Sequence, residues 1–464
     1  MEKNFTDLRQ QYPTFFYHSY DIVPQDDGLV LTFHFEIEGL CSFAPTTKIK
    51  TENLHLLNDY NSPLAKRIVF SLGMVELISY WKAACPKTVR VCCGNLSAED
   101  IAFFKHLYFR GLSEFFYLNH IDTSEAEFME IVCTSDAKAA EDAASTPYQD
   151  AGLHLIPVGG GKDSCVTAEL CKRFGDKNIF FTVNDQPART DTVLAAGYSE
   201  QSILRVYRTI DQNLLACNKA GFLNGHTPFS AIVAFLSYYC AYLIGAKDIV
   251  LSNESSANES NIAGTNINHQ YSKSYEFETD FNTYTARNFG TGIRYFSLLR
   301  AFSELQIAKQ FAAFPAYHDT FRSCNKGSRQ NIWCGKCAKC LFVFSVLSPF
   351  LDYDRLCEIF GGDLLSDTDL LADFDGLVGL SAVKPFDCVG TVREINFALC
   401  KTLEQFEKAH RPLPVLLQHF KEKATPEKAG DLLKERNELH HIPAEFLPMI
   451  EEMYHYVSQA SDLS

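Results

Sequence analysis

A glycine-rich segment between an apolar run and a predicted helix has the residue types that bind phosphate. Residues 157–165 have the sequence PVGGGKDSC. Glycines let backbone amides approach an anion closely, and the following helix start adds unpaired N–H groups and a positive dipole end. Lys162 would add charge, Asp163 would hold Mg²⁺ or fix the loop, and Ser164 would donate its hydroxyl. The sequence predicts nucleotide phosphate contacts from Gly159, Gly160, Gly161, Lys162, Asp163 and Ser164.

The loop differs from two common nucleotide motifs. It is too short for the Gly-x4-Gly-Lys-Ser/Thr loop of the common NTPases, and it lacks the Gly-x-Gly-x-x-Gly spacing of dinucleotide turns. An ordinary glycine-rich turn between a strand and a helix is the alternative, because such turns are common in α/β sheets.

Four cysteines share a second segment. Cys324, Cys334, Cys337 and Cys340 have the spacing Cys-x9-Cys-x2-Cys-x2-Cys. Four thiolates in a short loop can surround one tetrahedral Zn²⁺, and an iron–sulfur cluster is the open alternative. Because all four positions would be filled by sulfur, no position is left for a catalytic water, and we expect the metal to brace the fold. The negative charge would be offset by nearby basic residues, namely Lys326, Arg329, Lys336 and Lys339.

The elements around the glycine loop alternate between strands and helices. Residues 153–158, 178–183 and 248–251 are largely apolar runs, and residues 164–174 and 227–246 are predicted helices. This alternation predicts an α/β fold with a doubly wound parallel sheet and helices on its faces. In such sheets the ligand crevice lies beyond the carboxyl ends of the strands. The glycine loop, Asn184 and the segment 252–254 all fall at such ends.

The first third of the chain has a different pattern. Residues 31–38 alternate strictly between apolar and polar side chains, which indicates a half-buried strand. Ser62 and Pro63 would open a helix to about Ala84, residues 88–93 are a short predicted strand, and Ser97 would start another helix. We predict four parts: an N-terminal mixed α/β domain (1–134), a linker (135–150), a core with the phosphate loop and the cysteines (151–345), and a mostly helical C-terminal region (346–464), with helices near 393–407, 414–423 and 444–457.

One helix is long and uncharged enough to raise the question of a membrane span. Residues 227–246 carry no charge, but they include serines and several tyrosines and follow a start in which Thr227 would cap the helix and Pro228 would take its first position. Membrane helices are usually richer in Leu, Ile and Val. We therefore expect a helix buried in a soluble core and no membrane contact.

Composition narrows the classes of partner. The chain has 464 residues and a formal net charge of −15, so its overall field would repel a nucleic acid backbone. An acidic surface still permits a local cationic pocket for an anionic small molecule. Sixteen cysteines in so long a chain fit a reducing compartment, and the N-terminal residues lack the pattern of a signal peptide. We expect a cytoplasmic protein of undetermined oligomeric state that binds no nucleic acid.

The glycine loop resembles the Ser-Gly-Gly-x-Asp-Ser loop of the PP-loop ATP pyrophosphatases, with Gly159 where that family usually has Ser. The resemblance implies cleavage of ATP between the α and β phosphates, with AMP left on a substrate oxygen, and adenine binding by main-chain groups near Asn184. The cysteine loop resembles the four-Cys zinc loop of the 7-cyano-7-deazaguanine synthases, which belong to the same superfamily but are about half this length.

The whole-chain layout resembles the MurL-type UDP-N-acetylmuramoyl-L-alanyl-L-glutamate epimerases. The motifs that carry this resemblance are the glycine loop, SNESSAN at 252–258, HQYSKSY at 269–275, WCGKCAKC at 333–340 and KPFDCVG at 384–390. The family inverts the terminal L-Glu of a UDP-linked muramoyl dipeptide with ATP and Mg²⁺. Besides Lys162 and Asp163, the resemblance suggests Glu254, Asn258, His269, Lys273 and Cys388 around the acyl group, and Lys384 and Arg393 near a carboxylate or pyrophosphate.

Purely structural roles for the candidate residues, and other functions for the protein, stay open. Glu254 and Asn258 would equally cap a turn, residues 261–275 would equally form a solvated loop, and Cys388 would equally be a small core residue. Lys384 and Arg393 would equally be surface charges. An ATP-dependent ligase of the deazaguanine type and a nucleotide-binding protein without catalysis are the alternative functions.

Overall fold

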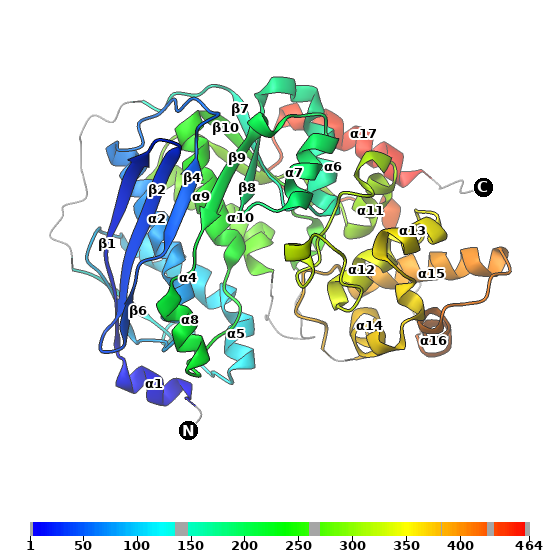
Figure 1. Cartoon of the computed structure of the whole chain (residues 1–464), viewed down its shortest axis with the longest axis horizontal. Helices are drawn as coiled ribbons and strands as arrows, with labels where there is room; N and C mark the ends of the chain where they lie inside the picture. The colour runs from blue at the N-terminus through cyan, green and yellow to red at the C-terminus, as the bar shows by residue number, and fades with distance from the viewer. Residues whose placement is uncertain (1–2, 135–146, 259–269, 382, 425–430, 460–464) are drawn as a thin grey trace.

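A single mixed sheet organises the computed structural model of the chain. The structure describes residues 3–134, 147–258, 270–381, 383–424 and 431–459. In this part of the chain eleven strands join in the order β11-β10-β7-β8-β9-β4-β2-β1-β5-β6, with β3 paired to β2. The α/β class predicted from the alternating elements is confirmed (Figure 1).

Five parallel strands form the half of the sheet that follows the predicted linker. They are β7 (Leu153–Pro157), β8 (Asn178–Val183), β9 (Ile203–Arg208), β10 (Ala246–Leu251) and β11 (Arg294–Ser297). The chain starts in the middle with β7, adds β8 and β9 on one side, and then returns to place β10 and β11 on the other. This reversal makes the gap between β7 and β10 a topological switch point, where open α/β sheets bind ligands.

Helices cover both faces of this half, as a doubly wound sheet requires. Along β7, Leu155 faces one hydrophobic core and Ile156 faces the other, because successive side chains of a strand point to opposite faces. The first core includes residues of α2 (Pro63–Glu76), α4 (Ala98–Gly111), α9 (Phe229–Ile244) and α10 (Tyr275–Asn288). The second includes residues of α6 (Lys162–Cys171), α7 (Pro187–Ala195), α11 (Glu304–Ala312) and α17 (Leu447–Ser458).

The N-terminal strands continue the same sheet. Strand β4 (Thr46–Lys50) pairs antiparallel with β9, so the sheet runs without a break across the boundary expected at residue 134. The remaining strands are β1 (Thr14–Gln25), β2 (Gly28–Ile37), β3 (Cys41–Phe43), β5 (Thr88–Val91) and β6 (Glu130–Cys133). Shorter helices on this side are α1 (Phe5–Gln11), α3 (Ile78–Trp81), α5 (Ser113–Leu118) and α8 (Gln212–Lys219). Most of the predicted linker, residues 135–146, lies outside the described residues.

The described residues after α11 form a helical layer beside the sheet (Figure 1). The helices are α12 (Ala338–Leu347), α13 (Tyr353–Phe360), α14 (Leu371–Val378), α15 (Val392–Lys408) and α16 (Val415–Lys423), followed by α17. Helix α17 returns to the sheet, where Phe446 at its start lies edge-on to Phe296 of β11, with 4.9 Å between ring centroids. The predicted helices near 393–407, 414–423 and 444–457 are confirmed within a few residues.

Two details of the helix predictions are wrong. Helix α9 begins at Phe229 with Pro228 as its N-cap, and no side chain caps it, so Thr227 does not have the predicted role. The helix predicted from Ser62 to Ala84 is divided at Leu77 into α2 and α3, although Ser62 does cap its start. Within the described residues, none of the helices has the length and apolar character needed to cross a membrane.

Candidate active site

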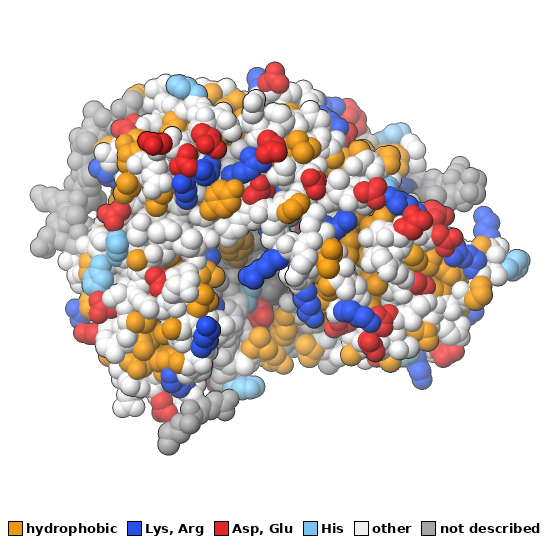
Figure 2. Space-filling model, in the orientation of Figure 1, with side chains coloured by type: hydrophobic (Ala, Val, Ile, Leu, Met, Phe, Trp, Pro, Cys, Tyr) orange, Lys and Arg blue, Asp and Glu red, His pale blue; other side chains and the backbone are white. Residues whose placement is uncertain are grey.

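A cavity of about 390 Å³ opens at the switch point of the sheet. Its walls come from the turn after β7, the end of β8, the start of α9, the segment after β10 and the four-cysteine loop. Figure 2 shows the molecule hollowed between its two halves, with lysine and arginine side chains near the edge of the hollow. The predicted residues that line the cavity are Gly159, Gly161, Asp163, Ser164, Ser252, Asn253, Glu254, Lys273, Cys324, Lys339 and Cys388.

The glycine loop is shaped by two of its glycines and by one internal hydroxyl. Gly161 is the N-cap of α6 and offers no side chain, and Gly160 has a φ of +83°, which favours glycine. The hydroxyl of Ser164 accepts from the Gly160 amide at 3.1 Å and donates to the Gly161 carbonyl at 2.9 Å. Ser164 therefore braces the loop from inside, so its hydroxyl is already engaged.

Lys162 is not among the residues that line the cavity. Its amine is buried and forms ion pairs with the carboxylates of Asp163 and Glu304, which begins α11. Burial lowers the pKa of Lys162, but the two carboxylates raise it by more, and the net shift is upward. The amine is therefore protonated, and the geometry favours a bracing role for Lys162 over direct contact with a phosphate.

Three carboxylates meet beside this lysine. One oxygen from each of Asp163, Glu254 and Glu304 lies within 4.8 Å of the others. Burial raises the pKa of Glu304, with the charges of Asp163 and Glu254 acting in the same direction and Lys162 acting against them. Carboxylate oxygens are the ligands that Mg²⁺ prefers, and one or two of them commonly hold it together with substrate phosphates. The cluster therefore fits a divalent cation next to the phosphate loop.

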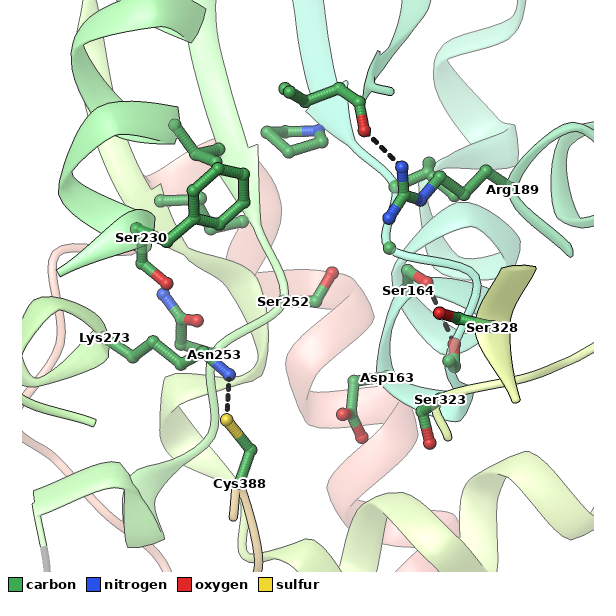
Figure 3. Close-up of a pocket in the computed structure, with 18 of the residues that line it drawn as sticks. Asp163, Ser164, Arg189, Ser230, Ser252, Asn253, Lys273, Ser323, Ser328 and Cys388 are labelled. Atoms are coloured by element: carbon green, nitrogen blue, oxygen red, sulfur yellow. Dashed lines mark hydrogen bonds between the residues drawn. The ribbon is translucent and has the colours of Figure 1, made fainter. Parts of the chain in front are cut away.

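A lysine–cysteine pair faces the cavity from another wall (Figure 3). The Nζ atom of Lys273 donates to Sγ of Cys388 at 3.1 Å. Burial lowers the pKa of Lys273, whereas Cys388 and Glu254 raise it, and the net shift is upward. The amine of Lys339 donates to the Cys388 carbonyl, which fixes the backbone of this residue. A protonated amine beside a thiol favours the thiolate, which can accept a proton.

Arg300 holds the segments that carry these groups. The side chain is fully buried, and its guanidinium donates to the carbonyls of Glu254 and Lys273, at 2.6 Å each. A third contact, of 3.2 Å, joins it to the carboxylate of Glu278. Arg300 thus connects the end of β10 to the turn before α10.

At the end of β8 the cavity is lined by Phe181, Val183 and Arg189, whereas Asn184, the residue predicted there, is not part of the lining. The backbone of Asn184 has a φ of +53°, and its side chain is exposed and accepts from the Arg208 amide at 2.8 Å. The carbonyls of Val183 and Asn184 both accept from the guanidinium of Arg189, which lines the cavity. Phe181 and Val183 supply apolar lining on this side. A planar base would fit against these side chains, with Arg189 at its edge.

The four cysteines converge as the spacing predicts. Neighbouring sulfurs are 3.9 Å (Cys324 and Cys337), 3.7 Å (Cys334 and Cys340) and 3.5 Å (Cys337 and Cys340) apart. A tetrahedral ion with Zn–S bonds of about 2.3 Å would have sulfur–sulfur distances of roughly 3.8 Å. The donor set and spacing therefore fit a single tetrahedral metal ion.

The charges around the thiols differ from the prediction. The Lys336 amine pairs with Asp367 and Asp369, and the Lys339 amine donates to the Cys388 carbonyl, so neither directly offsets the thiolates. Instead, the backbone amides of Gly327 and Lys336 donate to two of the sulfurs, at 3.1 and 3.5 Å.

Four other candidates do not line the cavity or lie outside the described residues. Arg393 forms an exposed ion pair with Glu435, which matches the bland alternative of a surface charge. Lys384 is buried and lies outside the cavity lining. His269 and the side chain of Asn258 lie outside the described residues.

Three residues in or beside the cavity were not foreseen from the sequence: Glu304 of the carboxylate cluster, and Arg189 and Arg322 of the cavity lining. Glu304 follows Ser303, whose capping box with Gln306 marks a helix start but indicates no ligand. Arg189 lies in an ordinary first turn of α7, and Arg322 precedes the cysteine loop without any motif of its own. The position of Arg322, two residues before a clustered cysteine, was the one available signal.

Fold and site together define an α/β protein with a glycine-rich turn at the start of α6, a carboxylate cluster and four clustered thiols. A family model described as the MurL N-terminal domain matches residues 6–298, and one described as the MurL C-terminal domain matches residues 320–432. The chain therefore belongs to the MurL family, and the resemblance predicted from its motifs is confirmed.

Three curated relatives support this assignment at 35% identity each, and each is named UDP-N-acetyl-alpha-D-muramoyl-L-alanyl-L-glutamate epimerase. The alignment with the protein of Xanthomonas oryzae pv. oryzae covers 74% of this chain and 76% of that protein. With the protein of Micromonospora sp. the shares are 81% and 84%. With the protein of Salinispora tropica they are 73% and 74%.

Proposed function

We propose that this protein is an ATP- and Mg²⁺-dependent epimerase that converts the terminal L-Glu of UDP-N-acetylmuramoyl-L-alanyl-L-glutamate to D-Glu. The names of the three relatives support the reaction and the substrate. One observation carries the assignment to this cavity. The phosphate-type loop, the carboxylates of Asp163 and Glu254, and the Lys273–Cys388 pair all line the same space.

ATP use answers a chemical difficulty of the reaction. The α-proton of a free glutamate carboxylate is very weakly acidic, because its removal would place two negative charges on adjacent atoms. Transfer of AMP to the carboxylate oxygen, with release of pyrophosphate, removes the carboxylate charge and makes the carbonyl an electron sink. A base then removes the α-proton, an acid returns a proton to the opposite face, and water releases AMP and the D-glutamyl product.

The nucleotide would bind with its phosphates on the glycine loop and its base against Phe181 and Val183. Backbone amides at the start of α6 serve as donors to the phosphates. Asp163, Glu254 and Glu304 would hold Mg²⁺, which neutralises phosphate charge when bound. Lys162 keeps two of these carboxylates in place through its buried ion pairs.

Cys388 is our candidate for proton transfer at the α-carbon. Its sulfur lies 3.1 Å from the protonated amine of Lys273, which stabilises a thiolate. Lys273 would then stabilise the negative charge that develops on the carbonyl oxygen of the adenylated glutamate. Arg300 positions both Lys273 and Glu254 through their carbonyls. His269, predicted from the same motif as Lys273, stays a candidate for the second proton-transfer group.

The four cysteines would hold a structural Zn²⁺. Their sulfur spacing suits a single tetrahedral ion, and four thiolates leave no position for a reacting water. A larger iron–sulfur cluster would need its thiolates farther apart, since several iron atoms lie between them.

The reaction can be tested in deuterium oxide with Mg-ATP and the UDP-linked dipeptide. We expect AMP, pyrophosphate, and D-Glu with deuterium at Cα after hydrolysis of the product. Cys388→Ala should lose inversion and α-deuterium while AMP formation continues, because the thiol acts after adenylation. Cys400→Ala is the matched control, since Cys400 lies on α15 outside the cavity lining.

Two outcomes would overturn parts of the proposal. AMP formation without inversion by the wild-type protein would retain adenylation and remove the epimerase function. Inversion that survives Cys388→Ala unchanged would remove Cys388 from proton transfer and leave the overall reaction standing.

A further inference from the structure

The segment that enters the four-cysteine loop is packed directly on the phosphate loop. The backbone N–H of Arg322 donates to the Gly160 carbonyl at 2.7 Å. A Cβ atom built on Gly161 would lie 3.1 Å from Cβ of Ser323. Both Arg322 and Ser323 line the cavity, and the next residue, Cys324, is one of the clustered thiols. The phosphate loop and the cysteine loop therefore share a wall of the cavity.

Among the described residues, Arg322 forms no ion pair with a carboxylate within 4.0 Å. Burial lowers its pKa, and the charges of Asp319 and Asp191 act against that shift. One terminal nitrogen donates to the Phe321 carbonyl at 2.6 Å, and its Nε is buried and makes no hydrogen bond. The guanidinium stays charged at any ordinary pH. A half-buried guanidinium with a free donor, next to a loop of backbone amides, is complementary to a phosphate group.

The phosphate loop also lacks a hydroxyl that a serine would give it. A Cβ atom on Gly159 would meet nothing within 4 Å, so a side chain at this position would project into open space. The hydroxyl of Ser164 is engaged within the loop. Ser323, which lies across from Gly161, brings another hydroxyl to the same space (Figure 3).

We propose that Arg322 and Ser323 bind the phosphate chain of the nucleotide, and that Ser323 supplies the hydroxyl absent at Gly159. The four-cysteine loop is then part of the nucleotide site, because Cys324 fixes the backbone of the two residues before it. This inference rests on the proposed use of ATP. It concerns phosphate contacts only, so inorganic triphosphate is a suitable probe besides Mg-ATP.

Binding of Mg-ATP and of triphosphate to the full-length protein, measured by calorimetry, tests the assignment. A hydrogen bond to a charged group is lost in Ser323→Ala and Arg322→Gln, so each should raise the Kd for both probes by roughly tenfold or more. Ser323→Thr keeps the hydroxyl and should bind within about threefold of wild type. Arg411→Gln is the matched control, because Arg411 forms an exposed ion pair with Asp354.

A second-site rescue separates phosphate contact from structural damage. Gly159→Ser has open space for its side chain, and in the Ser323→Ala background it should restore most of the lost affinity. Metal content and melting temperature should stay at wild-type values in these variants. A general loosening of the loop would lower both, and a serine at Gly159 would not correct it.

The outcomes are distinguishable. Wild-type binding of Mg-ATP with unchanged affinity in Ser323→Ala and Arg322→Gln would overturn this inference and leave the proposed function standing. Absence of any Mg-ATP or triphosphate binding by the wild-type protein would overturn both. Loss of binding without rescue by Gly159→Ser would restrict the assignment to Arg322 and overturn the role of Ser323.

Discussion

Replacement of Lys162 by Met should destabilise the protein strongly, because the amine is the buried partner of two acids. The side chains of Lys162 and Glu304 are only 3% and 2% exposed, so water screens their interaction little. The substitution would leave Glu304 buried beside Asp163 and Glu254 without the amine that pairs with it. Removal of one partner from a buried ion pair costs about 3–5 kcal/mol. We expect a loss of this size without added Mg²⁺ or ATP.

Urea unfolding followed by circular dichroism measures this loss. Lys172→Met is the matched control, since that lysine follows α6 and makes an i,i+3 pair with Glu169 while 38% exposed. Exposed pairs are worth about 0–1 kcal/mol, so the control should be close to wild type. In Lys162→Met/Glu304→Gln the buried carboxylate of Glu304 is replaced by a neutral amide. The double variant should therefore recover at least about 2 kcal/mol relative to Lys162→Met.

Two results would refute this account of Lys162. One is a cost below about 1 kcal/mol for Lys162→Met, which would mean that the amine is solvated and free to reach a ligand. The other is a double variant no more stable than Lys162→Met, which would mean that the loss comes from packing and not from an uncompensated carboxylate. The first result would restore direct phosphate contact as the leading role for this lysine.

Three further predictions concern other parts of the molecule. Burial lowers the pKa of Lys82 to about 8, so the native state holds fewer protons than the unfolded state between pH 8 and 10.5, and wild-type stability should rise with pH in that window. The stability of Lys82→Met relative to wild type should thus be about 3 kcal/mol more favourable at pH 7 than at pH 10.5 in urea titrations, and a constant difference would contradict the shift. Gly160→Ala should lower the melting temperature because φ is +83° and the new Cβ would lie 3.0 Å from Cβ of Ala188, whereas Gly159→Ala should be neutral, and equal effects would argue against this loop geometry. The purified protein should contain one zinc per chain by elemental analysis, Cys337→Ser should lose it together with thermal stability, and iron in its place would refute the assignment.

Local signals predicted the parts of the site that one segment builds by itself. The glycine loop follows a buried strand and starts a helix, and the cysteines lie within seventeen consecutive residues, so spacing alone indicated their chemistry. The alternation along residues 31–38 likewise identified β2, because one face of an antiparallel strand packs on a core while the other is more exposed.

The long-range contacts of the site could not be predicted from the sequence. Glu304 meets Lys162 across 142 positions, and Cys388 meets Lys273 across 115. Neither partner carries a local mark of the other, because the chain path that joins them depends on the packing of several helices. The pairing of β4 with β9 is also long-range. The sequence of a strand does not show whether the strand lies at the edge of a sheet or is paired on both sides. The predicted separate N-terminal domain did not anticipate this shared sheet.

The distribution of charge within the cavity suits the nucleotide binding that we propose, although the chain as a whole is acidic. Arg189 and Arg322 lie beside the phosphate loop, and the described residues give neither an ion pair with a carboxylate within 4.0 Å. The acids Asp163, Glu254 and Glu304 are gathered at one place, and Lys273 with Cys388 lies across the cavity from Asp163 (Figure 3). Repulsion by the net charge of −15 falls off within about 8 Å at physiological salt, whereas these cations act at contact distance.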